Sequence, residues 1–243
     1  PRLILEKNIY GLDIDDRAGQ LAYFALMMKA RSYSRRIFRD LERNPISLNV
    51  CSIQESNGLT KEDIEYFAGG DEELKNDVEY LVEVFTDAKE YGSILEVEKV
   101  DFDKLDDSIN KVEKGIVDLF NKDIRLNILK NMRNIVKQGR IIANKYDICV
   151  TNPPYMGNRG INSKLRDFIN SKYNDVKLDM YSVFIERCYK ICKPNSHLGF
   201  MTPFTWMFIS AYEKMRQNII EKRTITTLTQ LEYSGFPDAT VPI

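Results

Sequence analysis

Four consecutive residues, Asn152, Pro153, Pro154 and Tyr155, carry the groups needed to activate a weakly nucleophilic amine. An amine conjugated to an aromatic ring is a poor nucleophile because its lone pair is delocalised. The side-chain oxygen of Asn152 and the carbonyl of Pro153 would accept both N–H bonds and favour a tetrahedral nitrogen. The prolines fix φ, so this carbonyl stays aimed, and Tyr155 can stack on a base for about 1–3 kcal/mol. The competing interpretation is a rigid turn at the end of a strand, without chemistry.

A carboxylate, Asp13, lies near the end of another strand-like run, residues 9–14. If both runs are parallel strands of one sheet, Asp13 and Asn152 lie at its carboxyl edge, where ligands of such sheets bind. A strand terminator is the alternative role for Asp13, whereas Asp15 or Asp16 can cap the helix that follows.

The elements that must position these residues alternate between strand and helix. Strands are expected over residues 9–14, 46–53, 146–151, 198–202 and 225–231, and the strand 146–151 is expected to be buried. Helices are expected after Asp16, around residues 180–191, and over residues 211–221. The first of these should bury a stripe of Leu21, Phe24, Ala25 and Met28. A polar loop is expected over residues 156–177. This alternation favours an α/β fold with a Rossmann-like, doubly wound sheet.

Residues 59–145 have a different character. Their apolar residues keep helical spacing, and residues 59–110 carry 17 acidic and 5 basic side chains although the whole chain has a net charge of −1. We therefore expect three segments: residues 1–58 as the first part of the core (strands 2 and 3), 59–145 as a helical insertion, and 146–243 as the catalytic part.

Composition excludes several classes of protein. The 243 residues contain no apolar run long enough to span a membrane and no signal peptide, so a cytoplasmic protein without a membrane partner is expected. The four cysteines form no C-x-x-C pair and the chain has one histidine, so no metal site is expected. Because the chain begins with Pro1 and stops at a strand-like Val241, we expect a piece of a longer protein.

The sequence resembles the N6-adenine DNA methyltransferases, which carry an N-P-P-Y or D-P-P-Y loop. Residues 11–15 match the second strand of that family, residues 152–155 its catalytic loop, and residues 202–206 the segment after its fifth strand. Residues 235–241 resemble its later motif. The stretches 11–31 and 236–243 look most like the large phage-defence methyltransferases of the PglX type and their type II restriction-modification relatives.

The resemblance implies a function and a set of roles. S-adenosylmethionine would be the cofactor, with Asp13 on its ribose hydroxyls, and double-stranded DNA the substrate, with a flipped adenine held between Tyr155 and Phe236. Other subunits of a defence system are possible partners. The glycine-rich first motif of the family, together with the first strand of its sheet, would precede Pro1, and Ser52 and Gln54 stand where an acidic residue is expected. This chain alone is therefore expected to bind the cofactor weakly or not at all.

Two other functions remain open at this point. Similar loops occur in enzymes that methylate a glutamine amide of translation release factors, although those enzymes are compact. A non-catalytic nucleic-acid-binding module of a defence complex is the second alternative. Arg31, Arg35, Arg39 and Arg43, spaced by fours, suit either phosphate contacts or, preferably, a solvated helix face paired with acidic neighbours.

Overall fold

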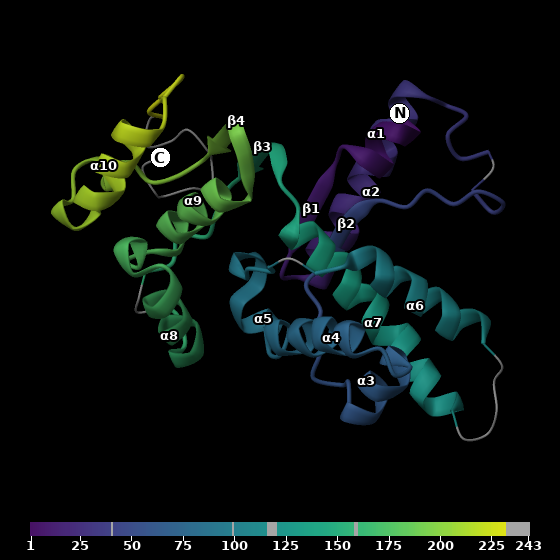
Figure 1. Cartoon of the computed structure of the whole chain (residues 1–243). Helices are drawn as coiled ribbons and strands as arrows, with labels where there is room; N and C mark the ends of the chain where they lie inside the picture. The colour runs from purple at the N-terminus through teal and green to yellow at the C-terminus, as the bar shows by residue number, and fades with distance from the viewer. Residues whose placement is uncertain (40, 99, 116–120, 158–159, 232–243) are drawn as a thin grey trace. The chain divides into compact units, whose positions relative to one another are not determined.

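The computed structural model describes the chain except residues 40, 99, 116–120, 158–159 and 232–243. It divides into two compact units, Pro1–Asn144 and Lys145–Ile243 (Figure 1). Each unit contains one pair of parallel strands with helices packed against it, so the fold is mixed α/β. The three segments expected from the sequence stay a prediction.

The first unit is built on a strand–helix–strand motif. After α1 (Arg2–Lys7), β1 (Tyr10–Asp13) pairs in parallel with β2 (Asn49–Ser52), and α2 (Asp16–Tyr33) connects them. The expected cap is confirmed, because the Asp15 side chain accepts from the main-chain N–H groups of Arg17 and Ala18 at 2.6 and 3.1 Å.

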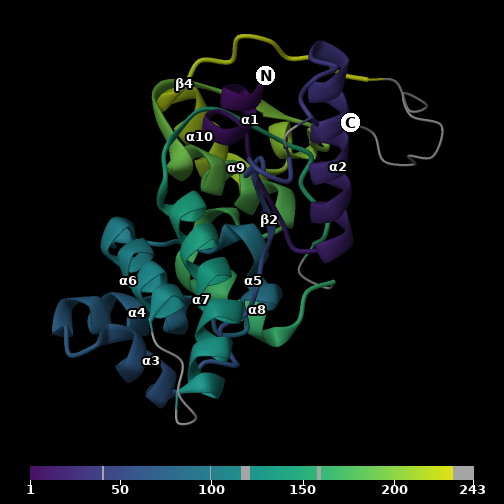
Figure 2. The ribbon, with the colours of Figure 1, turned by 90° about the vertical axis from the view of Figure 1, so that its right-hand side faces the viewer.

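The buried stripe predicted for α2 was wrong. Leu21, Phe24 and Met28 are exposed, and the helix buries Gly19, Met27 and Ala30 instead. Gly19 lies where α2 packs on β2: a Cβ added there would make an ordinary van der Waals contact, 3.4 Å from the main-chain nitrogen of Ser52 (Figure 2).

Five helices complete the first unit, and the helical character expected for residues 59–145 is confirmed. Helix α3 contacts α4, and α3, α4 and α6 all contact α7. Their fully buried side chains, among them Val78, Leu81, Phe85, Leu105 and Met132, form a core beside the strands. The helices are α3 (Lys61–Ala68), α4 (Glu72–Val84), α5 (Ala88–Tyr91), α6 (Phe102–Lys114) and α7 (Lys122–Ala143).

The second unit repeats the parallel arrangement. Strand β3 (Tyr146–Thr151) pairs with β4 (Cys192–Phe200), and α8 (Ser163–Lys172) and α9 (Met180–Ile191) lie between them in the chain. The bounds of β3 agree with the prediction, but the strand is not fully buried: Ile148 and Val150 are 65% and 74% exposed. The predicted polar loop was also wrong in part, because α8 lies within it.

The last expected strand is absent. Residues 225–231 follow α10 (Glu213–Lys222) without regular structure, and Ile225 and Leu228 are largely exposed. Threonine and apolar residues give this run a high strand propensity, but a strand forms only where a neighbouring strand supplies hydrogen bonds. None does so among the residues that the structure describes.

Candidate active site

The Asn152–Tyr155 loop begins where β3 ends, as expected. The pairing of β3 with β4 continues one step beyond the strands, because the N–H of Met201 donates to the Thr151 carbonyl at 3.3 Å. Pro153 is buried, whereas Asn152 and Pro154 are exposed. The loop is therefore anchored through one proline while the Asn152 side chain remains open to solvent.

Tyr155 connects this loop to the end of β4. Its hydroxyl lies 3.1 Å from the Met201 carbonyl and 3.2 Å from Oδ1 of Asn152, so one proton serves two acceptors. The ring packs edge-on against Tyr181, with centroids 6.3 Å apart. Partial burial raises the pKa of the Tyr155 hydroxyl, which keeps it protonated as a donor.

Asp179 holds the other end of the loop and was missed in the sequence. Its Oδ1 accepts from the N–H of Met156 at 3.0 Å and from the N–H of Tyr181 at 3.3 Å, so one carboxylate both caps α9 and fixes the loop. Burial raises the pKa of this carboxyl group. An aspartate directly before the apolar run of α9 was the signal that could have revealed the cap.

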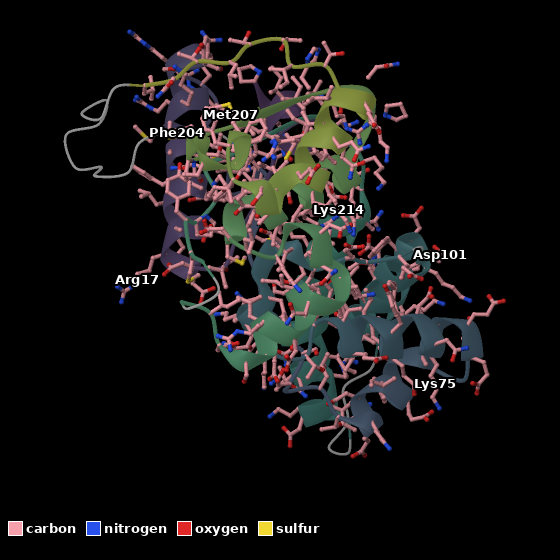
Figure 3. All side chains as sticks on the ribbon, turned by 90° about the vertical axis from the view of Figure 1, so that its left-hand side faces the viewer. Arg17, Lys75, Asp101, Phe204, Met207 and Lys214 are labelled. Atoms are coloured by element: carbon pink, nitrogen blue, oxygen red, sulfur yellow. The ribbon has the colours of Figure 1, made fainter. Side chains whose placement is uncertain are left out.

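Tyr181 of α9, which packs against Tyr155, also contacts the segment after β4. The Tyr181 hydroxyl lies 3.2 Å from the Thr205 hydroxyl, and its ring lies 5.8 Å from that of Tyr212. A groove of about 1460 Å³ opens beside β4, lined in part by Phe204, Trp206 and Met207, of which Figure 3 labels the first and third.

Asp13 lies at the carboxyl end of β1, in the first unit. It is exposed, and its Oδ1 accepts from the main-chain N–H of Asp15 at 2.9 Å. Among the described residues, its second oxygen has no hydrogen-bond donor, so it can accept from a ligand hydroxyl. Phe236 and the motif around it lie outside the described residues.

A second carboxylate, Asp16, lies beside Asp13 and is held by the protein itself. Gln54 Nε2 donates to it at 2.8 Å and Lys89 Nζ at 2.9 Å, and with the Ser52 hydroxyl they lower the pKa of Asp16 to about 2. Ser52 and Gln54, which stand where an acidic residue was expected, thus both hydrogen-bond to the carboxylate of Asp16.

Gln138 of α7 holds the main chain of Gln54, just after β2, and the sequence did not predict this role. We call this group, from the ends of β1 and β2 to Gln138, the first corner. Gln138 is fully buried, accepts from the Gln54 N–H and donates to the Gln54 carbonyl, both at 2.8 Å. A polar residue within the apolar face of α7 was the available signal. These bonds join a helix of the proposed insertion to the end of β2.

The described residues contain no group of three metal-ligating side chains that could hold an ion. They also include no helix with the length and hydropathy needed to cross a bilayer.

Comparison with known proteins shows which proteins this chain is similar to. Two relatives align with most of the chain: the adenine-specific methyltransferase BrxX of Escherichia coli O9:H4 (strain HS), 32% identical over 97% of the chain, and the adenine-specific methyltransferase PglX of Lacticaseibacillus casei (strain Zhang), 35% identical over 89%. The chain spans about a fifth of each, 21% and 18%. The type II restriction enzyme and methyltransferase RM.Eco57I of Escherichia coli is 32% identical over 35% of the chain and 9% of that protein.

The Eco57I restriction-modification methylase family model matches residues 7–236, which include both strand pairs and the loop at the end of β3. The chain belongs to the Eco57I restriction-modification methylase family.

Proposed function

We propose that the protein containing this chain is a site-specific DNA methyltransferase of a restriction-modification or phage-defence system, which methylates the N6 amine of adenine. The observation that carries the proposal is the Asn152–Tyr155 loop at the end of β3, with Pro153 buried and the Asn152 amide open to solvent. The names of two relatives, both adenine-specific methyltransferases, support adenine over a glutamine amide as the methyl acceptor.

In this proposal the chain acts mainly by positioning. The amine of an adenine flipped out of the duplex, at a cost of a few kcal/mol, would donate to Oδ1 of Asn152 and to the Pro153 carbonyl. These bonds favour a tetrahedral nitrogen with a localised lone pair, and directed acceptors of this kind stabilise the charge that develops during transfer. Tyr155 would stack on one face of the base and Phe236 would pack against it. Solvent can take the proton that the product amine loses.

The proposed cofactor is S-adenosylmethionine, which supplies an electrophilic sulfonium methyl group when bound. Asp13 suits its ribose, because the exposed carboxylate keeps one oxygen without a donor among the described residues. Asp16 would stay ionised nearby and orient Lys89 and Gln54. We further propose that the two parallel pairs are parts of one Rossmann-like, doubly wound sheet that carries residues 59–145 as an insertion.

The test uses the full-length protein in a bacterial host without adenine methylation. Wild type and Asn152→Ala are expressed, and N6-methyladenine is mapped by long-read sequencing. We expect a methylated motif in the wild-type strain and a loss of about 10²–10³-fold in the variant, the usual effect of removing one such hydrogen-bonding group. Asn134→Ala, at an exposed position of α7, is the matched control and should methylate as wild type does.

The alternatives predict other outcomes. If neither strain is methylated although both proteins are folded, the protein does not methylate adenine by itself in this host; methylation of a glutamine amide, and of DNA in the presence of other subunits of the defence system, become the next assays. If Asn152→Ala retains the defence activity, the loop is not catalytic and the module acts by binding.

A further inference from the structure

The C-terminal end of α2 and the turns after it carry a concentration of positive charge. Residues 29–43, here called the arginine segment, contain six basic side chains and two acidic ones. The prediction that its arginines form a stripe on one helix face was wrong, because α2 ends at Tyr33 and the later arginines lie in turns. The basic residues are Lys29, Arg31, Arg35, Arg36, Arg39 and Arg43.

Apolar contacts fix these turns on the first unit. Ile37, Phe38 and Leu41 pack against a buried cluster that includes Leu5 and Leu48. The segment is thus attached to the core through its apolar residues, while its basic residues are exposed to solvent.

Arg2 of α1 fixes the far end of the segment. Its guanidinium donates to the carbonyls of Asn44 and Pro45 at 2.9 and 2.7 Å, and to Oδ1 of Asn44 at 2.8 Å. A surface anchored on both sides needs less ordering when it binds a partner, so less binding free energy is lost.

All five arginines of the segment are exposed. In the described part of the chain, none of them forms an ion pair with a carboxylate. Three other arginines of the first unit pair with carboxylates: Arg2 with Glu6 at 2.9 Å, Arg133 with Glu113 at 2.6 Å, and Arg140 with Asp103 and Asp106. Unpaired charge among the described arginines of this unit is therefore concentrated in residues 29–43.

The acidic helices do not supply the missing partners. Residues 59–110 carry 17 acidic side chains, and several of these pair with cations outside the arginine segment: Glu65 with Lys75, Asp71 and Glu73 with Lys104, and Asp103 and Asp106 with Arg140. The exposed guanidinium groups of the arginine segment are thus open to an anion from outside the chain. Tyr33, 75% exposed with Lys29 Nζ 5.5 Å from its ring centroid, adds a hydroxyl donor to the same surface.

We propose that the arginine segment is a contact surface for the phosphate backbone of double-stranded DNA, separate from the methyl-transfer loop. The inference rests on the proposed function, which makes DNA the substrate. Guanidinium groups bind phosphate oxygens bidentately, and the anchored segment presents five of them to solvent. Such contacts position the protein on the duplex without reading its sequence.

The experiment measures duplex binding by the full-length protein by fluorescence anisotropy between 50 and 300 mM salt. The variant is Arg35→Gln/Arg36→Gln/Arg39→Gln. Each lost phosphate contact lowers the slope of log K against log salt by about 0.9, so we expect a slope shallower by about 2–3 and an affinity lower by about 10–100-fold at 100 mM salt. The loss should be the same on duplexes of unrelated sequence.

The control removes the same number of positive charges from groups that already have partners: Lys75→Gln/Arg133→Gln/Arg140→Gln. It should keep the wild-type slope. Equal slopes for wild type and the arginine-segment variant, with both proteins folded by circular dichroism, would overturn the proposal, as would a wild-type protein that does not bind DNA.

Footprinting on the wild-type protein avoids any folding defect of the variant. A dicarbonyl reagent that modifies arginine should label the arginine segment less when duplex is present and label Arg17 of α2 equally with and without it. Unchanged labelling of the segment would contradict the proposal. DNA binding that depends on the arginine segment, without any methylation, would contradict the proposed function but support the arginine segment as a DNA-binding surface. Methylation by the wild type, with the same salt slope for wild type and variant, would support the proposed function and contradict this surface.

Discussion

The two strand pairs end in polar residues that are held in opposite ways. At the end of β1 and β2, Asp16 already accepts from Ser52, Gln54 and Lys89. At the end of β3, the exposed Asn152 side chain has the Tyr155 hydroxyl as its hydrogen-bond partner in the described structure. The Asp16 carboxylate of the first corner is thus held by the chain itself, whereas the Asn152 amide of the second remains exposed. In the proposed function, the first corner would hold the cofactor and the second would accept from the reacting amine.

The largest expected effect comes from removing the buried support of the first corner. Gln138→Leu leaves the N–H and the carbonyl of Gln54 without their partner and should lower the free energy of unfolding by about 2–4 kcal/mol, since each unsatisfied buried group costs about 1–3 kcal/mol. Urea denaturation followed by circular dichroism measures it. Gln217→Leu, at an exposed position of α10, is the control, and equal stability of the two variants would show that Gln138 is not a support.

The second corner is tested through Tyr155 in the full-length protein. Tyr155→Phe keeps the ring and removes the hydroxyl shared by Asn152 and Met201, so kcat/KM for DNA methylation should fall about 5–10-fold. Tyr155→Ala also loses stacking and should fall about 100-fold. If the two variants lose activity equally, the hydroxyl alone accounts for the role of Tyr155.

Acid should affect the first corner selectively. The pKa of Asp16 is about 2 in the folded chain and near 4 in the unfolded one, so protons bind the unfolded state preferentially between these values. The stability that Asp16 provides is therefore present above about pH 4 and lost as the pH falls toward 2. Melting temperatures at pH 6 and pH 3 should differ less in Asp16→Asn than in wild type. Asp147→Asn, an exposed position of β3, should retain the wild-type difference.

The smallest expected effect is a difference in the reactivity of two cysteines, Cys51 in β2 and Cys149 in β3. The Cys188 thiol, 3.4 Å from Cys149 of β3, stabilises the Cys149 thiolate and lowers the pKa of Cys149 to about 7, whereas burial raises the pKa of Cys51 in β2. Alkylation by iodoacetamide, followed by mass spectrometry, should reach half its maximal rate near pH 7 at Cys149 and at a much higher pH at Cys51. Cys188→Ala should move the Cys149 midpoint upward; an unmoved midpoint would exclude Cys188 as the cause.

The sequence was a good guide wherever local pattern decides structure. It placed β3 at residues 146–151, the cap at Asp15 and the helices of residues 59–145, because strand propensity, capping chemistry and helical periodicity are properties of short stretches. It failed at residues 225–231 and at the stripe of α2, where the outcome depends on what lies opposite in space.

The candidate site divides in the same way. The sequence alone predicted the Asn152–Tyr155 loop and Asp13 as the candidate groups for chemistry, since residue type and order carry that information. Only the tertiary structure decided that Tyr155 bonds the end of β4, that Gln138 supports Gln54 across 84 residues, and that the arginines leave the helix and stay unpaired in the described chain. Each of these depends on which distant segment lies within hydrogen-bond reach or ion-pair distance, and chain order does not set that distance.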